Sequence, residues 1–256
     1  MKIIKLFILS AFSFLGCKSS DVSLSENKKI TIYMIGDSTM ANKKNPEVNP
    51  EFGWGQVFPD FLTNNITVSN HAVNGRSSKS YRELKHWQPV LDSLKKGDYV
   101  FIQFGHNDGK DTDPLRYTNP QTSYRHNLVQ YVEETRSKGA IPVLFSSIAR
   151  RKFNTEGVLL DSHGNYTLIT RLVAQEMNVP FIDMQYLTEQ LEISYGVEES
   201  KKLHLHFEKG ENAYFPDGKI DDTHLSILGA NEVANLASKE LVKQLPELNK
   251  YIKSIN

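Results

Sequence analysis

Five short apolar runs, separated by longer segments, constrain the fold of this 256-residue chain more than any other sequence feature. The runs are rich in β-branched and aromatic residues, as buried strands are, and most of them end at a polar or glycine-containing turn. They are residues 30–35, 66–68, 98–105, 141–145 and 179–184. Apolar strands that alternate with helices indicate a parallel sheet covered on both faces. We therefore predict one doubly wound α/β domain with a five-stranded parallel sheet between helices.

The segments between the runs predict the helices and loops of this fold. Helical spacing and capping residues predict helices around residues 57–62, from Ser77 or Ser78 past Trp87, and over 123–138, 165–177, 188–198 and 226–245. Residues 41–51 are rich in Asn, Lys and Pro and predict a loop. Residues 204–219, rich in His, Gly and Pro, predict a long irregular loop beside the functional site.

The overall composition is that of a globular domain without a strong charge bias. Hydrophobic residues make up 39% of the chain, and 30 basic side chains balance 30 acidic ones. This balance provides no bulk attraction to nucleic acid or to an anionic membrane surface. We therefore expect no nucleic-acid partner, and the sequence shows no sign of an obligate protein partner.

The first residues resemble a targeting segment. Two early lysines precede an apolar stretch at residues 6–15, which is too short to span a bilayer, and the stretch leads to Cys17. This pattern is similar to a bacterial lipoprotein signal over residues 1–17, in which the cysteine becomes the lipidated first residue. Phe14 is an unusual residue at its place in such a signal, and ordinary secretion with cleavage nearby is the alternative.

The polar, Ser-rich residues 18–29 predict a tether between this signal and a folded domain at residues 30–256. The protein is thus expected to be exported, in the periplasm or at the cell surface, with membrane contact only through a lipid on Cys17. Because Cys17 is the only cysteine, the domain has no internal disulfide, no cysteine nucleophile and no cysteine metal cluster.

Polar residues follow the first three predicted strands, and a second polar group precedes the last predicted helix. Ser38, Gly75 and Asn107 lie after the strands, whereas Asp221 and His224 lie before the helix. The carboxyl ends of parallel strands share one edge, where such sheets bind their ligands. A serine hydroxyl becomes a nucleophile when an imidazole accepts its proton and an acid orients that imidazole. This pattern indicates acyl transfer, with Ser38 as nucleophile, His224 as base and Asp221 as the orienting acid.

Acyl transfer also needs hydrogen-bond donors for the oxyanion. The backbone N–H groups of Ser38 and Gly75 and the side-chain amide of Asn107 are the candidates. Two alternatives stay open on the residues alone. The Gly-Asp-Ser sequence at Ser38 is also typical of a polar turn that caps a helix, and Asp222 is a second candidate for the orienting acid.

Four sequence blocks together resemble the SGNH (GDSL) hydrolase superfamily. They are residues 36–39, 74–76, 105–108 and 221–224, and they occur in the order of that family. The resemblance implies the SGNH hydrolase form of the flavodoxin-like fold. It also implies a Ser-His-Asp esterase with the roles given above, which works without a cofactor or metal.

Further blocks are similar to one branch of the superfamily, the rhamnogalacturonan acetylesterases of carbohydrate esterase family 12. These blocks are residues 53–56, 149–153 and 161–166. The similarity implies removal of acetyl groups from a pectin-type polysaccharide or oligosaccharide through an acetyl-enzyme intermediate. The alternatives are an acetylxylan esterase, a lipid-directed esterase or lysophospholipase, and a glycan-binding surface protein without turnover.

Three side chains are candidates for substrate binding. Trp54 has the surface to stack on a sugar ring, although packing in the core is an equal alternative. Arg76 and Arg150 have the planar guanidinium that recognises carboxylates, such as those of uronic acids. A metal site at His204, His206, Asp217 and Asp221 is not expected, because their spacing is not that of a closed zinc site.

Overall fold

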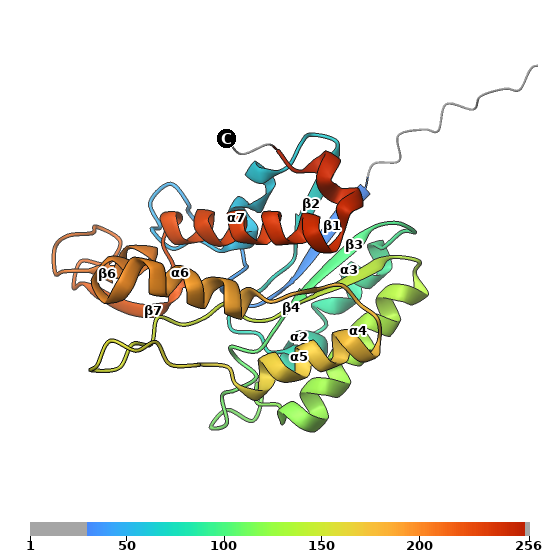
Figure 1. Ribbon diagram of the computed structural model, residues 1–256, viewed down its shortest axis with the longest axis horizontal. Coiled ribbons are helices and arrows are strands. Elements are labelled where there is room, and N and C mark those ends of the chain that lie inside the picture. Colours follow the sequence, from blue (N-terminus) through green and yellow to red (C-terminus); the bar gives the residue numbers. More distant parts are fainter. Residues whose placement is uncertain (1–29, 254–256) are drawn as a thin grey trace, which may run out of the picture.

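Five parallel strands form the centre of the computed structural model, which describes residues 30–253 (Figure 1). The strands are β1 (Ile30–Gly36), β2 (Ile66–Asn70), β3 (Tyr99–Gln103), β4 (Ile141–Phe145) and β5 (Phe181–Ile182), in the order β2-β1-β3-β4-β5. This is the doubly wound α/β domain that the sequence predicts. Cys17 and the expected signal and tether lie outside the described residues.

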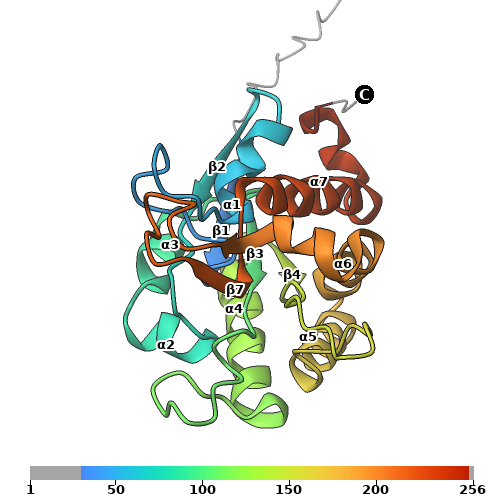
Figure 2. The ribbon, with the colours of Figure 1, turned by 90° about the vertical axis from the view of Figure 1, so that its left-hand side faces the viewer.

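Helices cover both faces of this sheet, as Figures 1 and 2 show from two sides. One face packs against α1 (Trp54–Val57), α6 (Met184–Glu199) and α7 (Ile227–Gln244). The other face packs against a second group of helices, which comprises α2 (Ser78–Glu83), α3 (Trp87–Ser93), α4 (Arg125–Ser137) and α5 (Asn165–Glu176). Short 3-10 or π turns occupy residues 58–61, 120–124, 200–203 and 246–251.

The strands serve two cores because successive side chains point to opposite faces. In β3, Phe101 packs in the core beneath α1, α6 and α7, whereas Val100 and Ile102 pack in the core beneath α2 to α5. All five residues of β3 are buried. Burial on both faces explains why this strand is a nearly continuous apolar run instead of an alternating one.

Three predicted segments differ from the observed fold. The helix expected at residues 57–62 is the last residue of α1 followed by a 3-10 turn at residues 58–61. The helix expected from Ser77 past Trp87 is two helices, α2 and α3, because Lys85 adopts a left-handed backbone conformation with φ of +60°. Ser77 does cap α2, since its side chain accepts a hydrogen bond from the Ser80 N–H.

The expected irregular loop at residues 204–219 instead begins with strand β6 (His204–Phe207), which pairs antiparallel with β7 (Lys219–Leu225). The prediction failed because β6 has only 4 residues and most residues of β7 are polar. Neither strand therefore has the apolar signal of a core strand. None of the helices between residues 30 and 253 is both long and apolar enough to cross a membrane.

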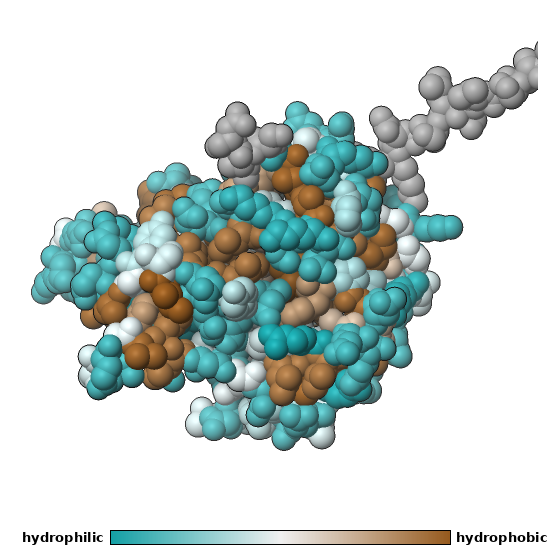
Figure 3. All heavy atoms as spheres, viewed as in Figure 1, coloured by the Kyte–Doolittle hydropathy of each residue, from teal (hydrophilic) through white to brown (hydrophobic). Residues whose placement is uncertain are grey.

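Hydrophilic and apolar residues are interspersed on the face of the molecule shown in Figure 3.

Isoleucines at two positions allow a matched test of the core. Ile102 of β3 is fully buried, whereas Ile193 of α6 is 54% exposed. We predict that Ile102→Ala lowers the free energy of unfolding by about 2–5 kcal/mol through the lost contacts and the cavity. Ile193→Ala should change it by less than about 0.5 kcal/mol. Denaturant titration of both variants measures this, and equal losses would contradict the core assignment.

Candidate active site

Ser38, His224 and Asp221 form one chain of hydrogen bonds. Nε2 of His224 lies 3.0 Å from Oγ of Ser38, and its Nδ1 lies 2.9 Å from Oδ2 of Asp221. Ser38 lies two residues after Gly36, the last residue of β1. His224 and Asp221 belong to β7. This is the geometry in which an imidazole accepts a serine proton while a carboxylate fixes its tautomer.

An irregularity in the β6–β7 pairing places the acid and the base. His204 pairs with Leu225, but the next residue, Leu205, pairs with Asp221. Residues 222–224 therefore bulge out of the ladder, with Asp221 just before the bulge and His224 as its last residue. Bulges commonly redirect side chains beside active sites. A bulged strand thus presents both side chains just before the last helix.

Asp221 is held in its ionised form. Its Oδ1 accepts hydrogen bonds from the backbone N–H groups of Thr223 and His224, each at 3.0 Å. Burial raises the pKa of Asp221, but these bonds, the bond from the His224 ring and the charge of His224 outweigh it and hold the pKa far below its usual range.

Asp222, the alternative acid, has other partners. Its Oδ1 lies 2.9 Å from a guanidinium nitrogen of Arg151 and 2.8 Å from Nε2 of His206. The geometry therefore favours Asp221 as the partner of His224.

The turn after β1 positions Ser38 without a helix. The fully buried Asp37 accepts hydrogen bonds from the N–H and the hydroxyl of Thr39, both at 2.9 Å, and its backbone oxygen accepts from Met40 and Ala41. Burial raises the pKa of Asp37 in spite of these bonds. Ser38 does not cap a helix, because the next helix, α1, starts at Trp54.

Lys43 braces the nucleophile turn and was not identified from the sequence. Its buried ammonium group lies 2.5 Å from the backbone oxygen of Ser38, 3.0 Å from Oδ1 of Asn74 and 2.7 Å from Glu51. Glu51 in turn lies 4.0 Å from Nε2 of His224. The only sequence signal was a lysine in a loop close to Ser38, which does not distinguish it from a solvated surface lysine.

The candidate oxyanion donors lie beside Ser38 at the ends of neighbouring strands. Gly75 has a φ of +72°, a conformation that favours glycine, and a side chain there would have little contact. Asn107 is 3% exposed, its Oδ1 accepts from Arg116 at 3.4 Å, and its Nδ2 donates to the backbone oxygen of Arg76 at 3.1 Å. These contacts orient the amide and leave its second N–H available for a substrate oxygen.

The polar residues next to Asn107 are structural. His106 is buried with its Nδ1 3.0 Å from Nε2 of His163. Burial lowers the pKa of His106 well below its usual value and that of His163 to about 3, so both rings are neutral at physiological pH. Asp108 is buried, accepts hydrogen bonds from Ser78 and Thr118, and has its pKa raised by burial to about 6.

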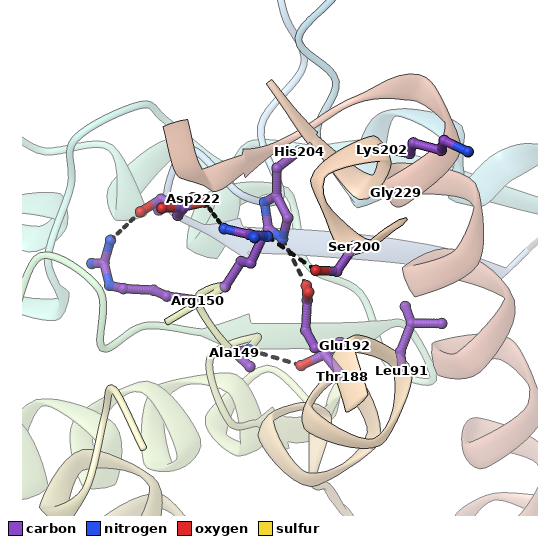
Figure 4. Close-up of polar contacts among 12 residues, drawn as sticks. Ala149, Arg150, Thr188, Leu191, Glu192, Ser200, Lys202, His204, Asp222 and Gly229 are labelled. Atoms are coloured by element: carbon purple, nitrogen blue, oxygen red, sulfur yellow. Dashed lines mark hydrogen bonds and ion pairs between the residues drawn. The ribbon is translucent and has the colours of Figure 1, made fainter. Parts of the chain in front are cut away.

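The three expected substrate-binding residues have different surroundings. Trp54 is fully buried, and its ring N–H donates to Gln103 at 2.9 Å, so its expected stacking on a sugar is wrong and its role is packing. Arg150 reaches towards the β7 bulge in Figure 4 and bonds to the hydroxyl of Thr223 and the backbone oxygen of His106. Burial lowers the pKa of Arg150, while Asp37 and Asp221 raise it.

Arg76 lines a cavity of about 320 Å³ together with Gly75, Arg116 and other residues. Arg116 is paired with Asp113, whereas the buried Nε of Arg76 has no hydrogen-bond partner among the described residues. Of the three candidates, Arg76 is therefore the one that lines a cavity beside an oxyanion donor.

The pattern of this site matches a known family. The family model of the GDSL-like lipase/acylhydrolases matches residues 32–237. The chain belongs to this family. This chain is a carboxylic ester hydrolase.

Sequence relatives belong to the branch expected from the motifs. Rhamnogalacturonan acetylesterase RhgT of Bacillus subtilis is 38% identical over 212 residues, which are 83% of this chain and 89% of that protein. The rhamnogalacturonan acetylesterase of Emericella nidulans is 29% identical over 83% of this chain and 84% of that protein.

Solved structures share the fold. The Bacillus subtilis protein YxiM has a TM-score of 0.72 at 26% identity, over 84% of this chain and 57% of that protein. The acetylxylan esterase Axe2 of Geobacillus stearothermophilus has a TM-score of 0.57 at 16% identity, over 83% of this chain and 94% of that protein.

Asp221 and Asp222 offer a matched test of the hydrogen-bond chain. We predict that Asp221→Asn lowers kcat for p-nitrophenyl acetate by about 10³–10⁴, because an amide no longer fixes the reactive tautomer of the imidazole. Asp222→Asn should stay within about tenfold of the wild type, since it weakens only the partly exposed contacts with Arg151 and His206. Steady-state kinetics of the two variants measures this, and a larger loss in Asp222→Asn would reverse the assignment of the acid.

Proposed function

We propose that this protein is a serine esterase that removes acetyl groups from acetylated rhamnogalacturonan or a related pectin. The hydrogen-bond chain from Ser38 through His224 to Asp221 is the observation that carries the proposal. The names of the sequence relatives support the substrate class, and the neighbouring donors at Gly75 and Asn107 support acyl transfer.

In the proposed reaction, Oγ of Ser38 attacks the acetyl carbonyl carbon while Nε2 of His224 accepts the serine proton. The N–H groups of Ser38 and Gly75 and the amide of Asn107 bind the oxyanion of the tetrahedral intermediate. His224 then donates its proton to the sugar oxygen, the ester bond breaks, and acetyl-Ser38 remains. Water attacks this ester with His224 as base, and acetate leaves.

Basic side chains near the nucleophile favour an acidic polysaccharide. Arg76 borders the cavity of about 320 Å³. Galacturonate units carry a carboxylate, which a guanidinium binds with two parallel hydrogen bonds. We propose that Arg76 binds such a carboxylate. Arg150 instead supports the β7 bulge through its hydrogen bond to the hydroxyl of Thr223.

Acetate release from a panel of substrates tests this function. We expect the wild type to release acetate at least about tenfold faster from acetylated rhamnogalacturonan than from acetylated xylan, because the neutral xylan lacks the charged contact. Ser38→Ala should be inactive on both. Arg76→Gln should lower the ratio of the rhamnogalacturonan rate to the p-nitrophenyl acetate rate about tenfold, and the exposed Arg125→Gln should leave this ratio unchanged.

Three outcomes of these and related assays would contradict the proposal. A preference for p-nitrophenyl octanoate over the acetate would favour a lipid-directed esterase. A faster rate on acetylated xylan would favour an acetylxylan esterase. An inactive wild type, with no labelling of Ser38 by a fluorophosphonate, would favour a glycan-binding protein.

We further propose that residues 1–17 are a lipoprotein signal, that Cys17 carries the lipid and that residues 18–29 tether the domain. The charged start, the apolar stretch and the single cysteine support this. In a bacterial host, we expect the wild type to incorporate an alkyne-tagged fatty acid and to sediment with membranes. Cys17→Ser should do neither. An unlabelled wild type recovered in the medium would instead support ordinary secretion.

A further inference from the structure

A buried pair of side chains, Glu192 and His204, lies behind His224 and has no part in the reaction described above. Glu192 belongs to α6 and His204 starts β6, and Figure 4 shows the two side chains pointing towards each other. Their side chains are 4% and 0% exposed, and Oε1 of Glu192 lies 2.6 Å from Nε2 of His204. Nδ1 of His204 lies 3.1 Å from the backbone oxygen of His224. The pair therefore connects α6 to the backbone of the proposed catalytic base.

Burying this pair of polar side chains lowers the stability of the fold relative to apolar side chains of similar size. Oε2 of Glu192 is buried without a hydrogen-bond partner among the described residues. A buried polar atom left without a partner costs free energy, and apolar side chains of similar size often stabilise a core as well as a buried ion pair does. Packing alone therefore does not account for Glu192 and His204 at these positions.

The contacts of His204 fix where its protons lie. A backbone carbonyl only accepts hydrogen bonds, so Nδ1 of His204 must carry a proton to bond with the oxygen of His224. A single further proton lies between Nε2 and Glu192. Whether it is on the ring or on the carboxyl, the pair has no net charge and Nδ1 remains a donor. Glu192 thus keeps His204 in the protonation state that holds His224.

His204 also stands at the point where the β6–β7 ladder is interrupted. The register jumps from Leu225 to Asp221 between His204 and Leu205, so the bulged residues 222–224 lack regular pairing with β6. At the start of the bulge, the backbone oxygen of Asp222 accepts from the N–H of Arg151 at 2.9 Å. At its end, the ring of His204 takes the place of the missing ladder bond at His224.

We propose that His204 is a positioning residue, which holds the backbone of His224 so that its ring lies in line between Asp221 and Ser38, and that Glu192 fixes the tautomer of His204. This inference rests on the proposed function, since it takes His224 as the base. A shift of about 1 Å in such a group costs up to about 10²-fold in rate.

Nitrogen-15 NMR of the histidine rings tests the proton placement in the wild-type protein itself. His204 is assigned by the loss of its signal in His204→Asn. We expect Nδ1 of His204 to be protonated at pH 7. An Nδ1 without a proton cannot donate to the carbonyl of His224, and that result would overturn the proposal.

Two double variants test the effect on catalysis. Glu192→Leu with His204→Leu removes the donor but keeps the volume, and we expect kcat for p-nitrophenyl acetate to fall about 10- to 100-fold with KM within about twofold. Glu192→Gln with His204→Asn keeps an amide donor near the position of Nδ1, and we expect kcat to return to within about fivefold of the wild type. Thermal unfolding confirms that each variant is folded.

The results separate this proposal from the proposed function. A folded leucine variant with wild-type kcat, or equal losses in both variants, would overturn the role of His204. If the leucine variant does not fold, the kcat of the amide variant and the NMR result still test the role of His204. A wild type that hydrolyses no more p-nitrophenyl acetate than the Ser38→Ala reference would instead overturn the proposed function. The NMR result would still report whether Nδ1 of His204 carries a proton.

Discussion

The parallel pairing of β1 with β2 on one side and β3 on the other is the constraint on which the rest of this molecule depends. Residues 32–36 of β1 pair with residues 99–103 of β3, and residues 30–34 pair with residues 66–70 of β2. Because all three strands end at the same edge, the turns that follow them meet there. The nucleophile turn and both neighbouring oxyanion candidates are therefore brought together by the register of a sheet whose own residues are mainly apolar.

The sequence was sufficient for the parts of this arrangement that depend on hydrophobic pattern. Strand β4 coincides with its predicted bounds, and the final helix begins one residue after its predicted start, with Ser226 as its cap. Ser38, His224 and Asp221 lie together as predicted, because their motifs follow strands or precede a helix. The wrong expectation at Trp54 has a general cause, since an aromatic ring suits a core as well as a sugar.

The undetected residues around the site are polar side chains whose contacts depend on tertiary packing. Glu192 and His204 are 12 residues apart and lie on a helix and an edge strand. Nothing in their local sequence differs from that of a solvated helix face or a polar loop. Lys43 belongs to a segment without periodicity, and its burial depends on Glu51 and Asn74. Such contacts follow from tertiary packing, so residue patterns do not reveal them.

The proposed catalytic residues come from two separate sheets. Ser38 follows the five-stranded sheet, whereas Asp221 and His224 belong to the two-stranded sheet of β6 and β7. A small sheet opens locally at a lower free energy than a buried core. Opening of this hairpin alone therefore separates Asp221 and His224 from Ser38, although it also exposes Leu225, which packs in the core beneath α1, α6 and α7. We therefore expect heat to inactivate the enzyme by opening this hairpin before the five-stranded sheet unfolds.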